Sequence, residues 1–124
     1  MGLLGHILEL ITGTDYETLV VQQISNILNM SDTRITLSHE QNMRLATPYY
    51  STPSSPKLPP VRVGYITFDV LKGCGALRST VADLITYVQA NLGLKQSSLS
   101  PAMEFQHIAR FKAGPGLTVC LGWL

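Results

Sequence analysis

The sequence predicts a helix-rich α+β fold. Apolar residues recur at helical spacing in residues 2–28 and again in residues 81–92, whereas the last eight residues alternate at the period of a strand. Prolines concentrate between these regions, where they disfavour regular helix. A length of 124 residues with 45% hydrophobic content is sufficient for the core of one globular domain.

The composition argues against two classes of partner. A net charge of +1, with 14% charged residues and no cluster of lysines or arginines, provides no surface suited to nucleic acid or an anionic membrane. His6 and Glu9 interrupt the N-terminal apolar run, which falls short of the roughly 18 residues of a membrane span. That run also has no basic n-region and no small-residue cleavage site, so it does not match a signal peptide, and the compartment stays unknown.

Residues 1–35 predict two paired helices. In residues 2–11 apolar side chains cover nearly the whole helical circumference, which is typical of a helix buried within a larger structure. The second helix is expected to begin with a capping box formed by Thr14 and Glu17. A short connection between the two helices predicts that they are neighbours.

Residues 36–72 predict a proline-rich excursion. Five prolines, interleaved with serines and two tyrosines, prevent a helix and favour an extended surface segment: Pro48, Pro53, Pro56, Pro59 and Pro60. Residues 44–50 and 61–67 are expected to form short strands on either side of it. We find neither an internal repeat nor a domain linker.

Residues 73–93 combine a glycine turn with the central helix. The glycines flanking Cys74 allow a tight or left-handed backbone, and Thr80 with Asp83 predicts a helix that begins near residue 81. Such a turn either lines a ligand cleft or forms a packed corner, and the local pattern favours the corner. Three residues are expected to close helices in the left-handed conformation: Gly13, Asn29 and Gly93.

Residues 94–124 predict a short helix followed by a strand. Ser100-Pro101 supplies an N-cap and first-turn pair for a helix through about Ala109. Residues 112–116 predict a turn, and residues 117–124 place apolar side chains on one face at period two. No sequence follows this strand to form a hairpin with it, so we expect it to be unpaired.

The histidines and cysteines predict no reactive centre. His6, His39 and His107 have no second ligand at metal-binding spacing, so structural or surface roles are favoured. Cys74 and Cys120 either pair or stay free, and small apolar core positions are favoured for both. We therefore expect neither a metal nor a cofactor.

Five segments of the chain, taken in order, carry a family resemblance. They are Met1-Gly2-Leu3-Leu4-Gly5, Ile11-Thr12-Gly13-Thr14-Asp15-Tyr16-Glu17, Ile27-Leu28-Asn29-Met30-Ser31-Asp32-Thr33, Gly73-Cys74-Gly75-Ala76-Leu77-Arg78-Ser79-Thr80-Val81-Ala82-Asp83-Leu84 and Gly122-Trp123. The first resembles a helix that follows a Tyr-x-Asn motif, and the others resemble, in turn, S-G-x-x-Y-E, P-L-G-M-x-D-T, A-G-G-L-x-S-T-A-x-D-L and G-L-G-W. Together they resemble the class C beta-lactamase and penicillin-binding-protein-like serine hydrolases, a superfamily that includes D-alanyl-D-alanine carboxypeptidases (DD-carboxypeptidases) and related esterases.

The resemblance implies a partial beta-lactamase/transpeptidase-like fold, with residues 1–124 as a single partial domain. The family's Ser-x-x-Lys and Tyr-x-Asn motifs would precede this segment, and its Lys/His-Thr-Gly strand would follow it. We therefore expect no catalytic residue in the chain, which would be an incomplete hydrolase, inactive alone. The implied parent activity is acyl-serine hydrolysis of a beta-lactam, a D-Ala-D-Ala peptide or an ester, and relatives are often periplasmic or secreted.

The resemblance also implies a substrate-cleft wall formed by Gly73, Cys74, Gly75 and Ala76. In the family this turn lies at the edge of the cleft, where side-chain size near Gly75 affects the acyl side chain. The alternative is a purely conformational corner. A complementing hydrolase segment would then supply the missing motifs.

Two segments match catalytic motifs in their letters alone. Ser54-Ser55-Pro56-Lys57 spells Ser-x-x-Lys, but the mechanism needs the serine and lysine one helical turn apart, and Pro56 disfavours that helix. Lys112-Ala113-Gly114 resembles Lys-Thr-Gly but precedes the Gly-Trp strand, whereas the family's motif follows it. A small enzyme that uses Ser54 and Lys57 in a new arrangement is kept as a separate hypothesis.

The alternative function is a non-catalytic interaction or self-associating module. The apolar helix of residues 2–11 and an unpaired final strand would both be exposed in an isolated chain. Both features favour a partner or self-association, and a monomer in solution would count against this hypothesis.

Overall fold

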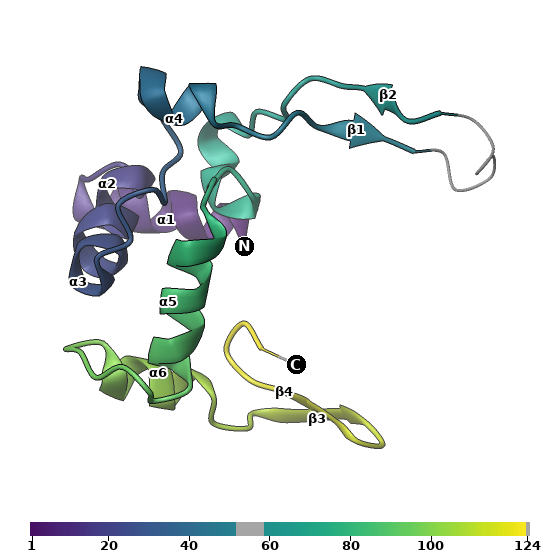
Figure 1. The fold of residues 1–124 in the computed structure, drawn as a ribbon. Helices are drawn as coiled ribbons and strands as arrows, with labels where there is room; N and C mark the ends of the chain where they lie inside the picture. The colour runs from purple at the N-terminus through teal and green to yellow at the C-terminus, as the bar shows by residue number, and fades with distance from the viewer. Residues whose placement is uncertain (52–58, 124) are drawn as a thin grey trace. The chain divides into compact units, whose positions relative to one another are not determined.

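The computed structural model describes residues 1–51 and 59–123 (Figure 1). The chain forms two units, each built from two stretches of sequence. The first unit contains Met1–Glu17 and Arg34–Arg78, and the second contains Thr18–Thr33 and Ser79–Leu124. Among the described residues, none of the helices is both long and apolar enough to cross a membrane.

The first unit is organised around the packing of α1 (Gly2–Thr12) on the 3₁₀ helix η2 (Asp69–Cys74). Gly2 and Gly5 are the buried residues of α1, whereas its large apolar side chains are 40–76% exposed. The sequence predicts that this helix is buried within a larger structure and exposed in an isolated chain, and its large apolar side chains are exposed here. The reason is that glycines, which have no side chain to separate the backbones, make the contact with η2.

A second helical segment follows, composed of α2 (Tyr16–Val20), the π-helical turn η1 (Val21–Ser25) and α3 (Asn26–Leu28). The capping box predicted for its start does not form. The Thr14 hydroxyl donates to the Thr12 carbonyl at 3.4 Å, and Glu17 Oε1 accepts hydrogen bonds from distant backbone N–H groups. The predicted C-terminal closure is confirmed, because Asn29 adopts φ 60° and ψ 40°.

The proline-rich region contains one helix that we did not predict. Helix α4 (His39–Met43) precedes the first proline and begins with a capping box between Ser38 and Gln41. The strands β1 (Tyr49–Tyr50) and β2 (Val61–Arg62) pair antiparallel and lie within the two predicted ranges. Helix α4 therefore ends before Pro48, the first of the prolines that disfavour helix.

The second unit has a small core in which α5 (Val81–Asn91) and α6 (Ser100–Gln106) pack together. Its buried residues are Leu28, Met30, Ala90 and Met103, and Ile24, Tyr87 and Leu99 pack against them. The predicted start of α5 is confirmed, because the Thr80 side chain accepts a hydrogen bond from the Asp83 N–H.

The predicted end of α5 is also confirmed. Gly93 adopts φ 71°, its N–H donates to the Ala90 carbonyl, and the Leu94 N–H donates to the Gln89 carbonyl. This pair of hydrogen bonds satisfies carbonyls that the helix leaves open, as in a Schellman motif. Helix α6 starts at Ser100 itself and ends at Gln106, three residues earlier than predicted.

The C-terminal strand is not unpaired. Strand β4 (Leu117–Val119) forms an antiparallel hairpin with β3 (Phe111–Gly114), a segment that we had partly assigned to a turn. The partner precedes β4 in the sequence rather than following it. Gly116, at φ 74°, supplies the left-handed residue that so short a connection requires.

Candidate functional site

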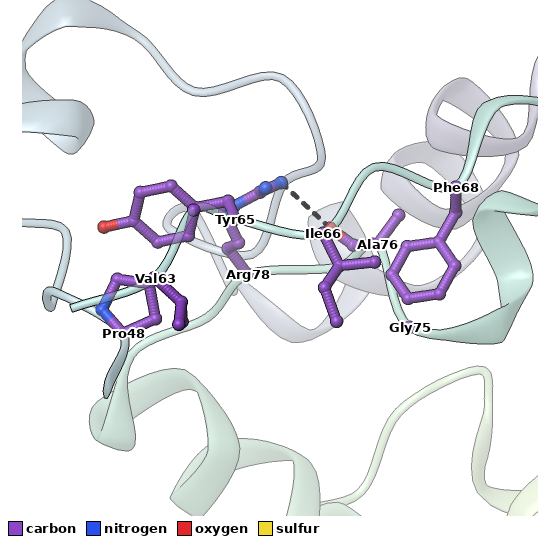
Figure 2. Close-up of a pocket in the computed structure, with 9 residues that line it drawn as sticks. Pro48, Val63, Tyr65, Ile66, Phe68, Gly75, Ala76 and Arg78 are labelled. Atoms are coloured by element: carbon purple, nitrogen blue, oxygen red, sulfur yellow. Dashed lines mark hydrogen bonds between the residues drawn. The ribbon is translucent and has the colours of Figure 1, made fainter. Parts of the chain in front are cut away.

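The first unit contains a cavity of about 340 Å³ beside the predicted glycine turn (Figure 2). The turn that follows η2 forms one side, and the segment that follows β2 forms another. Most lining residues are apolar, and Arg78 is the charged one among them. The lining consists of Pro48, Val63, Gly64, Tyr65, Ile66, Phe68, Gly75, Ala76 and Arg78.

The turn itself depends on Gly75. This residue has φ 150° and ψ 20°, a conformation that residues with a side chain rarely adopt. A Cβ atom built on Gly75 would lie 3.4 Å from Cζ of Phe68, which also lines the cavity. The next residue, Ala76, is 7% exposed, and its N–H donates to the Lys72 carbonyl at 3.1 Å. Glycine therefore permits the turn and keeps the cavity wall open.

Arg78 is held in a defined position at the cavity. Its Nη1 donates to the carbonyl oxygens of Ile35 and Ala76, both at 3.1 Å, and Figure 2 shows the second of these bonds. Its guanidinium carbon lies 5.6 Å from the centre of the Tyr65 ring. The Tyr65 hydroxyl in turn donates to the Ala46 carbonyl at 2.7 Å. These contacts orient a cation beside an apolar cavity.

The four predicted wall residues separate into two pairs. Gly75 and Ala76 line the cavity, whereas Gly73 faces α1, where a Cβ would lie 3.2 Å from the Met1 carbonyl oxygen. Cys74 is exposed, and its Cβ lies 3.2 Å from the position of a Cβ built on Gly2. One half of the turn therefore packs as a corner, and the other half lines a cavity.

The Glu9 carboxylate connects three parts of the first unit, which are α1, the start of α2 and η2. The Glu9 carboxylate accepts the Tyr16 N–H at 2.8 Å, and it lies 3.5 Å from Lys72 Nζ and 3.2 Å from His6 Nδ1. The Tyr16 hydrogen bond, followed by the His6 contact, lowers the pKa of Glu9. Burial raises the pKa of the Tyr16 phenol. These contacts stabilise the packing beside the glycine turn rather than supplying a reactive group.

Glu17 has a similar structural role. Its Oε1 accepts the N–H groups of Ile35 and Thr36, each at 2.8 Å. Burial acts to raise the pKa of Glu17, but the hydrogen bonds from Thr36 and Ile35 together outweigh it, and the pKa is lowered. Because Ile35 also accepts the Arg78 hydrogen bond, Glu17 and Arg78 fix the same short stretch of backbone.

A buried polar network in the second unit was not predicted. Asp83 Oδ2 accepts the Asp32 N–H at 2.9 Å and the Thr33 hydroxyl at 2.8 Å, and Thr33 Oγ1 lies 2.8 Å from Ser79 Oγ. Asp83 is 8% exposed and Thr33 is 6% exposed. The position of Asp83 in the first turn of α5 pointed only to capping. The network joins the segment after α3 to the start of α5.

The remaining candidate residues lie in separate places. The His107 ring makes an edge contact with Trp123, and the Cys120 thiol donates to the His107 carbonyl at 3.2 Å. Cys74 and Cys120 are both free thiols. Across residues 1–51 and 59–123 no group of three His, Cys, Asp or Glu side chains is placed to hold a metal ion.

The structure describes one of the two segments that match catalytic motifs in their letters. Ser54-Ser55-Pro56-Lys57 lies outside the described residues. Lys112 lies in β3, where it pairs with Thr118 of β4. The Lys112-Ala113-Gly114 segment is therefore one strand of the C-terminal hairpin.

Comparison with known proteins identifies relatives of the whole chain. The family model described as Beta-lactamase matches residues 1–123. Among solved structures, D-alanine carboxypeptidase AmpC from Burkholderia cenocepacia is 30% identical to this chain, with a TM-score of 0.77. The match covers 97% of this chain and 33% of the carboxypeptidase chain. A beta-lactamase/D-alanine carboxypeptidase from Pseudomonas syringae is 28% identical with a TM-score of 0.75, covering 97% and 32%. A class C beta-lactamase in complex with cefoxitin is 27% identical with a TM-score of 0.77, covering 97% and 32%.

These matches confirm the family resemblance and the partial beta-lactamase/transpeptidase-like fold. A search of curated proteins found no match. The chain spans about a third of the length of the solved structures to which it is similar. Since the family model matches nearly every residue, this chain belongs to the beta-lactamase family.

Proposed function

We propose that this chain forms one wall of the substrate cleft of a beta-lactamase-family serine hydrolase. The proposed parent activity is acyl-serine hydrolysis of a beta-lactam, a D-Ala-D-Ala peptide or an ester. The observation that carries the proposal is the cavity beside Gly75 and Ala76, at the turn that the resemblance assigns to the cleft edge. The relatives described as a D-alanine carboxypeptidase and a class C beta-lactamase support the same reaction class.

We further propose that the chain has no hydrolase activity alone. Acyl transfer by this mechanism needs a nucleophile, a base within hydrogen-bond reach and an oxyanion site, all held together. The motifs that supply these groups in the family fall outside the segments that this chain resembles. A complementing hydrolase segment would have to provide them.

Incubation of the purified chain with a fluorophosphonate probe and a chromogenic cephalosporin tests this proposal. We expect no specific labelling and no turnover above buffer. Labelling of any serine would contradict it, and a Ser54→Ala variant would then show whether Ser54 is the labelled residue. A polypeptide carrying the family's three catalytic motifs should restore turnover when mixed with this chain, and failure to restore it would count against the cleft-wall role.

The second candidate function is self-association or partner binding. The observation that favours it is the exposed apolar surface of α1, where Leu10 is 70% exposed and Ile11 is 76% exposed. Light scattering after size-exclusion chromatography would detect oligomers, and a Leu10→Lys variant should reduce them. A monomer at every concentration would exclude self-association and count against this candidate.

A further inference from the structure

Arg78 is a cation in an apolar setting, and among the residues that the structure describes no carboxylate forms an ion pair with it. Its interactions with the described residues are the two carbonyl hydrogen bonds, the backbone bridge to Arg34 and the contact with the Tyr65 ring. None of these is an ion pair with Asp or Glu. A half-buried guanidinium that has no counter-ion within residues 1–51 and 59–123 favours a site that accepts an anion from outside the chain.

The geometry leaves part of the guanidinium available. Both carbonyl hydrogen bonds are made by Nη1, and the plane is oriented by Tyr65, so Nη2 and Nε remain as donors. Two donors of one guanidinium form the planar fork that binds a carboxylate in a bidentate manner. The fixed Nη1 reduces the conformational entropy that such binding would cost.

The dimensions of the cavity suit a small ligand or one side group of a larger ligand. Its volume of about 340 Å³ is at the small end of ligand pockets, which run from about 300 to 1,000 Å³. Side chains of Val63, Ile66 and Phe68 provide apolar surface in the cavity that Arg78 also lines (Figure 2). The space therefore suits one side group that has an apolar body and an anionic end.

We propose that the cavity binds an acyl side group that carries a carboxylate on an apolar or aromatic body, with Arg78 as the residue that recognises the carboxylate. This inference rests on the proposed cleft-wall function and names the class of substrate side group. Gly75 leaves room for the body of the group, and Arg78 selects for its charge. A neutral group of the same shape would fill the same space without the charged hydrogen bonds.

A titration of the full chain with phenylacetate and phenylacetamide tests this inference. The two probes have nearly the same shape and differ in charge. In ¹⁵N-edited NMR spectra, phenylacetate should shift the amide signals of Gly75, Ala76 and Arg78 in a saturable manner. Charged hydrogen bonds predict that it binds about tenfold more tightly than phenylacetamide. Equal affinities, or no saturable shifts at these residues, would overturn the inference.

Variants separate charge recognition from loss of structure. Arg78→Gln should abolish the preference for phenylacetate, Arg78→Lys should retain part of it, and Arg62→Gln, which removes an exposed charge of β2 in the same unit, should leave it unchanged. If Arg78→Gln unfolds the first unit, the Arg78→Lys spectrum decides: it must show intact folding and a reduced preference. A preference that survives in every folded Arg78 variant would contradict the inference.

This experiment fails independently of the proposed function. It measures binding by the chain itself and requires no turnover or catalytic partner. Phenylacetate selectivity without restored hydrolysis would reject the cleft-wall role and keep the carboxylate site. Restored hydrolysis without phenylacetate selectivity would support the cleft-wall role and reject the carboxylate site.

Discussion

Gly5 of α1 and Gly73 of η2 approach so closely that a Cβ added to Gly5 would lie 3.3 Å from the Gly73 Cα. The same atom would lie 3.1 Å from the Tyr16 ring. Two helical segments that are 68 positions apart in the sequence can meet at this distance only because neither has a side chain there. This contact holds one end of the glycine turn, and the other end of the turn lines the cavity.

A larger residue at Gly5 should separate the two segments. We expect Gly5→Leu to lower the free energy of unfolding by about 2 kcal/mol or more, because the side chain would meet backbone and an aromatic ring. Urea unfolding followed by circular dichroism measures the change. Leu10→Ala on the exposed side of α1 is the control, with an expected effect within about 0.5 kcal/mol. Equal effects for the two variants would show that the glycine contact does not limit stability.

The cavity turn provides a second matched pair. Gly75→Ala should destabilise the chain by about 1–3 kcal/mol, since φ 150° is strained for any residue with a Cβ. Gly64 lines the same cavity, has no atom within 4 Å of an added Cβ and has no positive φ. Gly64→Ala should therefore be neutral or slightly stabilising. Thermal unfolding of both variants tests the difference, and a neutral Gly75→Ala would refute the conformational argument.

Asp83 should be the most sensitive polar residue of the second unit. Asp83→Ala removes the acceptor of the hydrogen bonds from the Asp32 N–H and the Thr33 hydroxyl. We expect a loss of about 2–3 kcal/mol in the free energy of unfolding, because those donors lie in a buried region. Asp83→Asn keeps one acceptor oxygen and should lose less. If Ala and Asn cost the same, the carboxylate would be important for its charge rather than for its hydrogen bonds.

Acid should weaken the first unit through Glu17. Its pKa is lowered below the ordinary value of 4.5 in the folded state, so the unfolded state binds the proton more readily. The resulting stability is present above about pH 4.5 and is lost as pH falls through the folded-state pKa. Urea unfolding between pH 3 and 7 should show a shallower acid dependence in Glu17→Gln than in the parent.

Glu40→Gln, on the exposed face of α4, is the control for removing one carboxylate. Glu9 also has a lowered pKa, so part of the acid dependence should persist in Glu17→Gln. An unchanged profile in Glu17→Gln would mean that the hydrogen bonds from Ile35 and Thr36 contribute no acid sensitivity.

The sequence predicted the local signals well and the long-range ones poorly. Thr80 caps α5, Asn29 and Gly93 are left-handed, and the family resemblance placed the glycine turn. Glu17 was assigned to a capping box, but its carboxylate bonds to residues 35 and 36. No pattern within residues 14–17 could show that, because the competing donors lie 18 and 19 positions away.

The predicted site shows the same division. The resemblance implies a role for residues 73–76 but none for Arg78, since a lone arginine after a glycine turn matches no functional motif. Its importance depends on Ile35 and Tyr65, which come to it from other segments. The end of the sequence after the final strand predicts that this strand is unpaired, whereas its partner β3 lies before it in the chain.

By itself, the sequence determined the family, the helix-rich composition and the helix ends at Thr80, Asn29 and Gly93. Those features depend on backbone preferences and hydrogen bonds between residues a few positions apart, so the local order of residue types is sufficient to predict them. Only the tertiary structure decided that Gly73 packs against α1 while Gly75 opens a cavity. It also placed Arg78 beside that cavity, because packing brings together residues whose separation along the chain contains no sign of their contact.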